Sequence, residues 1–364
     1  MSMFVSAGLS AQPVKQDGPL FRFAEIPVLP DPVGFAGMFA GVAGESMVAA
    51  GGHRFADGVP WWDGGVKVWS DAIFIYSFRT KSWRVASQTL ARPVGDGVSA
   101  SYNGEIVFAG GGDAHRAYAD VVSLRNVEGH LRIDSLPPMP RPCLRMGGAL
   151  VGSILYIVAG RDHPTQGPSL QTFWAMDLAE QPAARRWKSL PPWPGPARMM
   201  PIVASAQGCL LVVGGIEVVV DNQGRALNRA PYLRDAYRYR PGAGDSAGAW
   251  ESLPSTPHPV AGAPSPAWTP RASQVVIFGG VDGTIEPIAD RSSVRALPDG
   301  ILSLDLATKT WSSLGRMPPA TTRVNAPAVT WNGGYFIVSG EHLPARRTNA
   351  VTRIERAAGS DVTK

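Results

Sequence analysis

A glutamate and an arginine near the C-terminus have the side chains that acid–base chemistry on an anion requires. Glu341 directly follows a glycine, and Arg347 lies six residues later, beyond Pro344. A carboxylate can carry a proton, and an arginine fork can bind a substrate carboxylate through two hydrogen bonds. The competing interpretation is a salt bridge that only orders the loop, and the spacing alone favours it.

Further polar residues follow glycines that end other apolar strands. Candidates for contact with a substrate are His53, Arg54, Asp113, His115 and Arg161. An imidazole titrates near neutral pH, and a guanidinium binds anions. A solvated or capping role competes with substrate binding at these positions.

A repeated unit must position these loops. An apolar strand ending in glycine occurs six times, as MVAAGG, IVFAGG, LYIVAG, LLVVGG, VVIFGG and YFIVSG. The first glycines of successive units are 59, 50, 54, 65 and 61 residues apart, near the Kelch period of about 50 residues with loop insertions. Glycine suits a strand end beside a crowded channel, where a side chain would clash. The sequence therefore predicts an all-β fold, a six-bladed Kelch-type β-propeller whose post-glycine loops meet at one mouth of the channel.

Tryptophans mark the fourth strand of four units. They are Trp83, Trp187, Trp250 and Trp311, and Leu-Pro or Met-Pro turns typically follow them. A large ring can fill the gap between radially packed sheets, so we expect these side chains to pack between blades.

The two ends of the chain predict how the propeller closes. The last unit stops without a fourth strand, whereas FRFAEIPVLP at residues 21–30 has the pattern of an outer strand with no blade before it. Pairing Phe21–Ile26 with the C-terminal blade would remove an exposed seam. We expect a flexible leader at residues 1–20, one propeller domain at 21–357 and a tail at 358–364.

Composition narrows the function classes. The chain has 41 Gly and 33 Pro with 17% charged residues, which suits many short strands and tight turns. The net charge of +5 is spread without a basic run, so we expect no nucleic-acid binding but a mild attraction for small anions. No apolar run reaches 18 residues, so no membrane span is expected.

Cysteines and histidines give no sign of a metal site or a disulfide framework. Cys143 and Cys209 lie in apolar, strand-like stretches and are interpreted as core residues. The six His residues lack ligand spacing, so no metal is expected. The N-terminus lacks a basic signal region. We expect a periplasmic or secreted protein if a signal was clipped, and a cytoplasmic one otherwise.

The C-terminal loop resembles that of a known family. Gly340-Glu341-x-x-Pro344-x-x-Arg347-Thr348-x-Ala350-Val351 is similar to the glutamate and arginine loop of the sialic acid mutarotases, or N-acetylneuraminate epimerases, which are six-bladed Kelch propellers. The resemblance implies that Glu341 is the proton acceptor and that Arg347 is important for activity. Residues 31–55 and 60–76 resemble a cyclically permuted subgroup. Ala345 and Asn349 depart from the family's usual glycine and aspartate.

The activity implied by the resemblance is interconversion of the α and β anomers of N-acetylneuraminate. A base at the anomeric hydroxyl and an acid at the sugar ring oxygen would open and reclose the hemiketal. Arg347 would anchor the carboxylate of this small anionic sugar, and no cofactor is needed. The sequence leaves the acid and the oligomeric state open.

Two other functions compete with mutarotation. A protein-interaction module would present a broad aromatic surface formed by Trp61 and Trp62, whereas an enzyme would have a small pocket around Glu341. Another carbohydrate enzyme is the third possibility, although the Ser-x-Asp-x-Gly-x-x-Trp turns of a sialidase are absent from the sequence.

Overall fold

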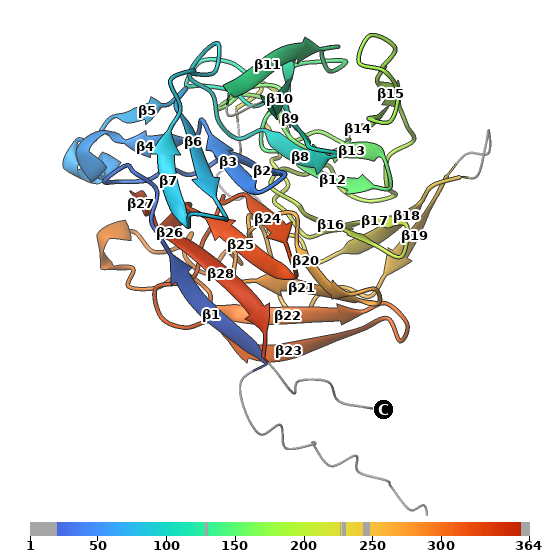
Figure 1. Cartoon of the computed structure of the whole chain (residues 1–364). Coiled ribbons are helices and arrows are strands. Elements are labelled where there is room, and N and C mark those ends of the chain that lie inside the picture. Colours follow the sequence, from blue (N-terminus) through green and yellow to red (C-terminus); the bar gives the residue numbers. More distant parts are fainter. Residues whose placement is uncertain (1–19, 128–129, 226, 228–230, 243–247, 358–364) are drawn as a thin grey trace, which may run out of the picture.

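The fold is a β-propeller, as predicted. A computed structural model describes residues 20–127, 130–225, 227, 231–242 and 248–357 (Figure 1). These residues form six antiparallel four-stranded blades. Except for Leu20, the expected leader and tail lie outside the described residues, and the domain boundaries stay a prediction.

The blades share one pattern, in which the first strand lies innermost and contacts the first strand of the next blade. The blades are β2 (Phe39–Ala43), β3 (Ser46–Ala50), β6 (Ile73–Ser77), β7 (Ser82–Val85); β8 (Val98–Tyr102), β9 (Glu105–Ala109), β10 (Val121–Val127), β11 (His130–Leu136); β12 (Gly147–Val151), β13 (Ile154–Val158), β14 (Phe173–Asp177), β15 (Lys188–Ser189); β16 (Ile202–Ala206), β17 (Cys209–Val213), β18 (Ala236–Arg240), β19 (Ala249–Leu253); β20 (Trp268–Arg271), β21 (Gln274–Phe278), β22 (Gly300–Asp305), β23 (Thr310–Arg316); and β24 (Ala328–Trp331), β25 (Gly334–Val338), β28 (Val351–Arg356), β1 (Phe21–Ile26).

Short elements lie between the blade strands. They are the hairpins β4 (His53–Phe55) with β5 (Lys67–Trp69) and β26 (Glu341–Leu343) with β27 (Arg346–Arg347), and the 3-10 turns η1 (Ala56–Gly58), η2 (Trp61–Asp63) and η3 (Arg291–Ser293). In the described part of the chain, no helix is long and apolar enough to cross a membrane.

The N-terminal strand closes the propeller. β1 pairs antiparallel with β28 along its whole length, from Phe21 opposite Arg356 to Ile26 opposite Val351, and the two strands lie side by side in Figure 1. The Phe21 ring is buried and meets Phe278 of the preceding blade edge-on, with centroids 5.4 Å apart. The predicted pairing of the two chain ends is therefore confirmed.

The hydrophobic core is divided among the blade interfaces. Six clusters of buried side chains lie between neighbouring blades of the described chain. The second strands, such as CLLVV in β17, are buried along their length because a blade packs on each face. Cys209 lies in such a strand, whereas Cys143 lies in the loop before β12 and not in a strand as predicted; both are buried and unpaired.

The four fourth-strand tryptophans join neighbouring blades, as predicted. Each ring packs on a blade-interface cluster. Each indole N–H also donates to the carbonyl of a proline that directly follows the outer strand of the preceding blade, or comes two residues after it. The pairs are Trp83 to Pro27, Trp187 to Pro137, Trp250 to Pro191 and Trp311 to Pro254, at 2.7–3.0 Å. The tryptophan and the Pro turn are thus one repeated contact.

The second strand of each blade ends in two residues with positive φ. The second of them is always glycine, with φ between +91° and +107°, whereas Ala159 and Ser339 replace the first glycine in two blades. A Cβ on Gly52 would lie 2.7 Å from Met38 Cγ, and one on Gly340 would lie 2.7 Å from Ala326 Cβ. The strict need for glycine is therefore at the second position, where the chain passes the neighbouring loop.

Candidate functional site

The loops that follow the second strands share one face with the loops between blades. An isolated bridge joins the residue after each second glycine to an inter-blade loop, as in Ala36 with His53, Leu144 with Arg161 and Val324 with Glu341. His53, Arg161 and Glu341 therefore occupy equivalent positions around the channel.

Six residues of the inter-blade loops form a closed ring of backbone hydrogen bonds at the channel axis, here called the axial ring. Its members are Gly37, Asp96, Arg145, Met200, Gly262 and Asn325, all with φ between +51° and +64°. Each donates its N–H to the carbonyl of the preceding member, at 2.6–3.0 Å. In this ring six backbone N–H groups and six backbone carbonyls have hydrogen-bond partners. The side chains of Asp96, Arg145 and Asn325 lie at the axis.

Glu341 and Arg347 lie together at the loop end of the channel. They are cross-strand partners in the β26–β27 hairpin, and Arg347 Nη1 donates to Glu341 Oε2 at 2.5 Å. The backbone N–H of Ala345 donates to Glu341 Oε1 at 3.2 Å, and Ala345 has a φ of +57°, which favours the family's glycine. The Arg347 side chain is 4% exposed and the Glu341 side chain 25%, so the carboxylate is the more accessible partner.

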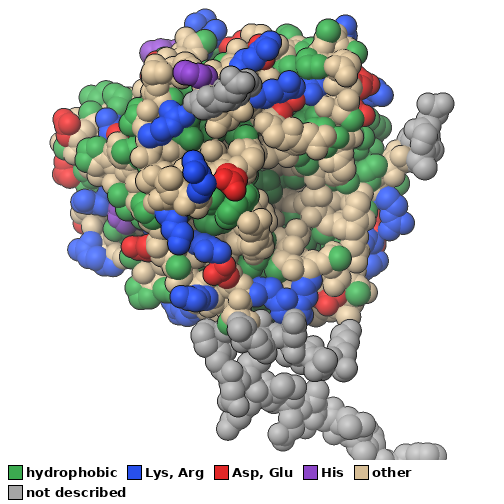
Figure 2. All heavy atoms as spheres, viewed as in Figure 1, with side chains coloured by type: hydrophobic (Ala, Val, Ile, Leu, Met, Phe, Trp, Pro, Cys, Tyr) green, Lys and Arg blue, Asp and Glu red, His purple; other side chains and the backbone are tan. Residues whose placement is uncertain are grey.

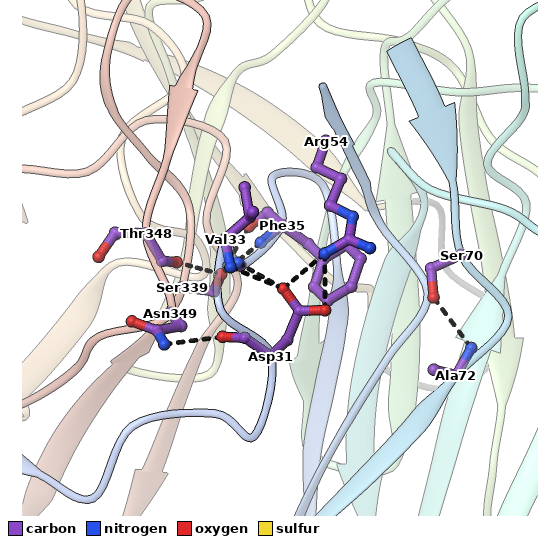
Figure 3. Close-up of polar contacts among 10 residues, drawn as sticks. Asp31, Val33, Phe35, Arg54, Ser70, Ala72, Ser339, Thr348 and Asn349 are labelled. Carbon is purple, nitrogen blue, oxygen red and sulfur yellow. Dashed lines mark hydrogen bonds and ion pairs between the residues drawn. The ribbon is translucent and has the colours of Figure 1, made fainter. Parts of the chain in front are cut away.

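The base of this hairpin is fixed to the loop that enters the first blade (Figure 3). Ser339 Oγ accepts from the Phe35 N–H at 2.8 Å and lies 2.6 Å from the Thr348 carbonyl. Asn349 Nδ2 donates to the Asp31 carbonyl at 2.7 Å. The family's aspartate could not donate this bond when ionised. The departure at Asn349 therefore ties the two loops together.

The β4–β5 hairpin covers this site and separates its side chains by face. Phe55 lies opposite Lys67, and His53 lies opposite Trp69. The Arg347 guanidinium lies 5.3 Å from the Phe55 ring centroid, and Lys67 Nζ lies 4.8 Å from that of Trp69. Alternation along a strand therefore places these four side chains on the face toward the channel.

Arg54 lies on the opposite face of that hairpin. Its Nη1 donates to both oxygens of Asp31, at 2.8 and 2.7 Å (Figure 3). The same Asp31 carboxylate accepts the N–H groups of Val33 and Gly34. The guanidinium of Arg54 is thus engaged in holding the loop that enters the first blade.

His53 meets Asp96 of the axial ring inside the site. His53 Nε2 lies 3.1 Å from Asp96 Oδ1, which also accepts from Asn325 Nδ2 at 2.7 Å. Burial lowers the pKa of His53 to about 4, although the Asp96 carboxylate opposes this shift. The imidazole is therefore neutral at pH 7, with its proton on Nε2.

Asp96 is held as a carboxylate. Burial would raise its pKa, but the hydrogen bond from His53 and the nearby Arg145 and Lys67 cations hold the pKa well below its usual value. Arg145 Nε lies 3.5 Å from Asp96 Oδ2. We call the charged and titratable side chains gathered here the Glu341 cluster. It consists of Glu341, Arg347, His53, Asp96, Arg145 and Lys67.

The other predicted site residues order their own loops. Asp113 accepts the Tyr118 hydroxyl and the N–H groups of His115 and Arg116. His115 is exposed. Arg161 is buried and donates to the carbonyls of residues 164, 166 and 167. Their roles in substrate binding stay predictions.

Sequence reasoning missed Asp96, Arg145, Asn325 and Lys67. The first three could have been found from spacing, because each precedes the second glycine of its blade by 15 residues, as does Gly37. That constant distance is one strand, one tight turn and a second strand. Lys67 gave no such signal, since only the hairpin register brings it beside Phe55.

Two cavities lie along the axis. One of about 70 Å³ is lined by Asp96, Arg145 and Asn325. Another of about 320 Å³ follows the innermost strands and is lined mainly by small or hydroxyl side chains such as Ala40, Ser99 and Ser205. Figure 2 shows the molecule hollowed at the middle of the propeller, with few charged side chains in the hollow. The charged groups of the Glu341 cluster come instead from the loops and hairpins around the axial ring.

Curated relatives of the chain share one name. The chain is 26% identical to the N-acetylneuraminate epimerases of Haemophilus influenzae strains PittEE and 86-028NP over 225 residues. The match covers 55% of this chain and 54% of each relative. The N-acetylneuraminate epimerase of Pasteurella multocida is 24% identical over 230 residues, 56% of this chain and 54% of that protein. The chain thus spans about half the length of the curated relatives it matches. No protein-family model matches it.

Proposed function

We propose that this chain catalyses the mutarotation of N-acetylneuraminate or a related sialic acid. The observation that carries the proposal is the pairing of an accessible Glu341 carboxylate with Arg347 at the loop end of a propeller channel. The names of the curated relatives support the same reaction. The cluster holds three permanent or ionisable cations, Arg347, Arg145 and Lys67, which suits an anionic sugar.

Glu341 acts as the base in this mechanism. Its carboxylate takes the proton of the anomeric hydroxyl while the sugar ring oxygen gains a proton, so the hemiketal opens to a ketone. Rotation presents the other carbonyl face, and the reverse transfers close the ring as the second anomer. No electrons are transferred.

Arg347 binds both the base and the substrate. One terminal nitrogen binds Glu341, and we assign the other to the substrate carboxylate, because a guanidinium presents several donors in a fixed plane. The 70 Å³ axial cavity is far below the roughly 300 Å³ at which ligand pockets begin. The two cavities found along the axis, of about 70 and 320 Å³, are not lined by Glu341. We assign the sugar instead to the space between the β4–β5 and β26–β27 hairpins, because Glu341 and Arg347 lie there.

The test is anomer exchange of free sialic acid followed by NMR. Wild-type protein should accelerate exchange above the buffer rate, and a sialoside with a blocked anomeric hydroxyl should stay unchanged. Glu341→Gln keeps the shape but removes the base, so exchange should fall by about 10² to 10⁴ while calorimetry still detects sialic acid binding. Wild-type exchange equal to that in buffer refutes the function; full exchange by folded Glu341→Gln refutes the base.

A protein-interaction module is a second candidate, and one observation favours it. The loop between β4 and β5 exposes Val59, Trp61 and Val66, with Trp61 58% exposed, and Val68 of β5 is also exposed. Trp62, in contrast, is not fully exposed, so the aromatic surface is narrower than the sequence suggested. A propeller that only binds a partner would leave the anomer exchange rate at its buffer value.

A further inference from the structure

The proposed mutarotation needs a proton donor at the sugar ring oxygen, and the Glu341 cluster contains few side chains that could serve. Arg145 and Arg347 are unsuited to this role, because a guanidinium does not act as a proton donor to substrate in proteins. His53 is neutral at pH 7, with its remaining proton directed to Asp96. A donor has to be protonated in the resting site and able to release its proton near neutral pH.

Lys67 has the required position. It is the cross-strand partner of Phe55, whose ring lies against Arg347, and β4 contacts β27 directly. The side chain lies on the channel face of the hairpin, with Nζ over Trp69. The packing of the two hairpins therefore brings Lys67 to the side of the cluster that holds Arg347 and its partner Glu341.

Lys67 also has its protons available. It is partly buried, yet within the described ranges its ammonium has no hydrogen-bond or ion-pair partner. The other cations of the cluster are engaged, since Arg347 binds Glu341 and Arg145 approaches Asp96. The ammonium lies over the Trp69 ring and is not among the fully buried polar atoms that lack a partner, so it is accessible to a ligand in the site.

We propose that Lys67 is the general acid that protonates the sugar ring oxygen, opposite Glu341 as the base. This inference rests on the proposed function. As Glu341 takes the anomeric proton, the bond from the anomeric carbon to the ring oxygen breaks and Lys67 gives its proton to that oxygen. Glu341 is then protonated and Lys67 neutral; ring closure on the other face returns both protons.

The charges around Lys67 suit this role. Burial lowers the pKa of Lys67 to about 8; Arg145 and Arg347 act in the same direction, and Asp96 and Glu341 oppose them. His53 of the neighbouring strand is neutral at pH 7. A donor with a pKa near the working pH transfers its proton most effectively.

The experiment compares Lys67→Arg and Lys67→Met with Lys188→Met, which makes the same change at an exposed position of β15. Anomer exchange is measured by NMR from pH 6 to 10 after subtraction of buffer exchange, and sialic acid binding by calorimetry. Lys67→Arg keeps the charge but cannot release the proton. Its kcat should fall about 10²- to 10⁴-fold with nearly unchanged affinity, and the wild-type decline above about pH 8 should disappear.

The outcomes separate this inference from the function on which it rests. If wild type is active and Lys67→Arg has the same rate and the same alkaline decline, Lys67 is not the acid. The proposed mutarotase function would then still stand. Full activity in Lys67→Arg with lost binding in Lys67→Met also overturns it, because Lys67 is then an anion ligand. A wild-type protein without exchange activity overturns both proposals.

Discussion

At the scale of single residues, local register decides which partner each charged group has. Glu341 and Arg347 meet because they lie opposite each other in the two-stranded β26–β27 hairpin, so the six-residue spacing in the sequence is a cross-strand pairing. Arg346, one position earlier, is exposed on the other side. The two arginines therefore form a matched pair for an experiment.

Replacing Arg347 by Lys tests the assigned carboxylate anchor. The substitution keeps the charge but loses the planar fork, and a lost hydrogen bond to a charged group costs about 1.5–3 kcal/mol. Sialic acid affinity measured by calorimetry should therefore fall about ten- to hundredfold. Arg346→Lys is the control and should bind like wild type. Equal affinities for both variants would remove Arg347 from the binding site.

His53 predicts a pH dependence of stability. Its pKa of about 4 in the folded protein lies below the 6.5 of the unfolded chain, so between these values the unfolded state binds more protons. This contribution is complete above pH 6.5 and is lost as the pH falls toward 4, at no more than about 1.4 kcal/mol per pH unit. Urea unfolding of wild type and His53→Gln at pH 7, 6, 5 and 4.5 measures this contribution to the free energy of unfolding.

The difference between the two proteins reports on His53, since the other carboxylates are common to both and Asp96, whose pKa His53 helps to lower, has an unfolded-state pKa of 3.8, below the pH range measured. Wild type should lose more unfolding free energy than His53→Gln over that range. Parallel losses in the two proteins would contradict a buried neutral imidazole.

At the scale of elements, the tryptophan of the fourth strand and the proline turn of the preceding blade act as one joint. The indole of Trp250 donates to the Pro191 carbonyl at 2.9 Å and packs against Phe173 with ring centroids 5.0 Å apart. The contact therefore combines a directional bond with apolar packing between neighbouring blades.

Trp250→Phe would keep an aromatic ring but remove the N–H donor. A typical net hydrogen bond contributes about 0.5–1.5 kcal/mol, so the free energy of unfolding should fall by at least that amount, with further loss from the smaller ring. Guanidinium unfolding measures the change. Trp61→Phe, at an exposed tryptophan, should leave stability nearly unchanged; an equally small effect at Trp250 would show that the joint contributes little.

At the scale of the whole molecule, stability depends on closing the propeller with its own N-terminus. Besides pairing with β28, this segment supplies the Pro27 carbonyl to Trp83 and the buried Leu29 side chain. Because every blade contacts two neighbours, the position of the cut in the chain leaves neighbour contacts intact. The cyclic permutation inferred from the sequence is compatible with this geometry and stays a prediction.

Removal of the closing strand tests that dependence. Deletion of residues 1–30 exposes the edge of β28 and the Phe278 ring on which Phe21 packs. The melting temperature should therefore fall well below that of a protein lacking residues 1–15. Thermal unfolding of the two truncated proteins, followed by circular dichroism, gives the comparison. Identical melting temperatures would refute the closure as a source of stability.

The sequence by itself determined the features that repeat or that depend on local backbone sterics. Six glycine-ended strands, the tryptophan of the fourth strand and the unmatched strand at Phe21–Ile26 predicted the propeller and its closure, because each blade uses the same local geometry. The choice of Glu341 and Arg347 also came from sequence, through six-residue spacing and family resemblance.

Tertiary structure decided which polar side chains share a site. Arg54 and His53 are neighbours in sequence, yet strand alternation sends Arg54 to Asp31 and His53 to Asp96. Asp96 and Asn325 are 229 residues apart and meet only because the propeller closes around its axis. Lys67 reaches the cluster through the packing of two hairpins. Such contacts depend on how the blades are arranged in space, which no local pattern records.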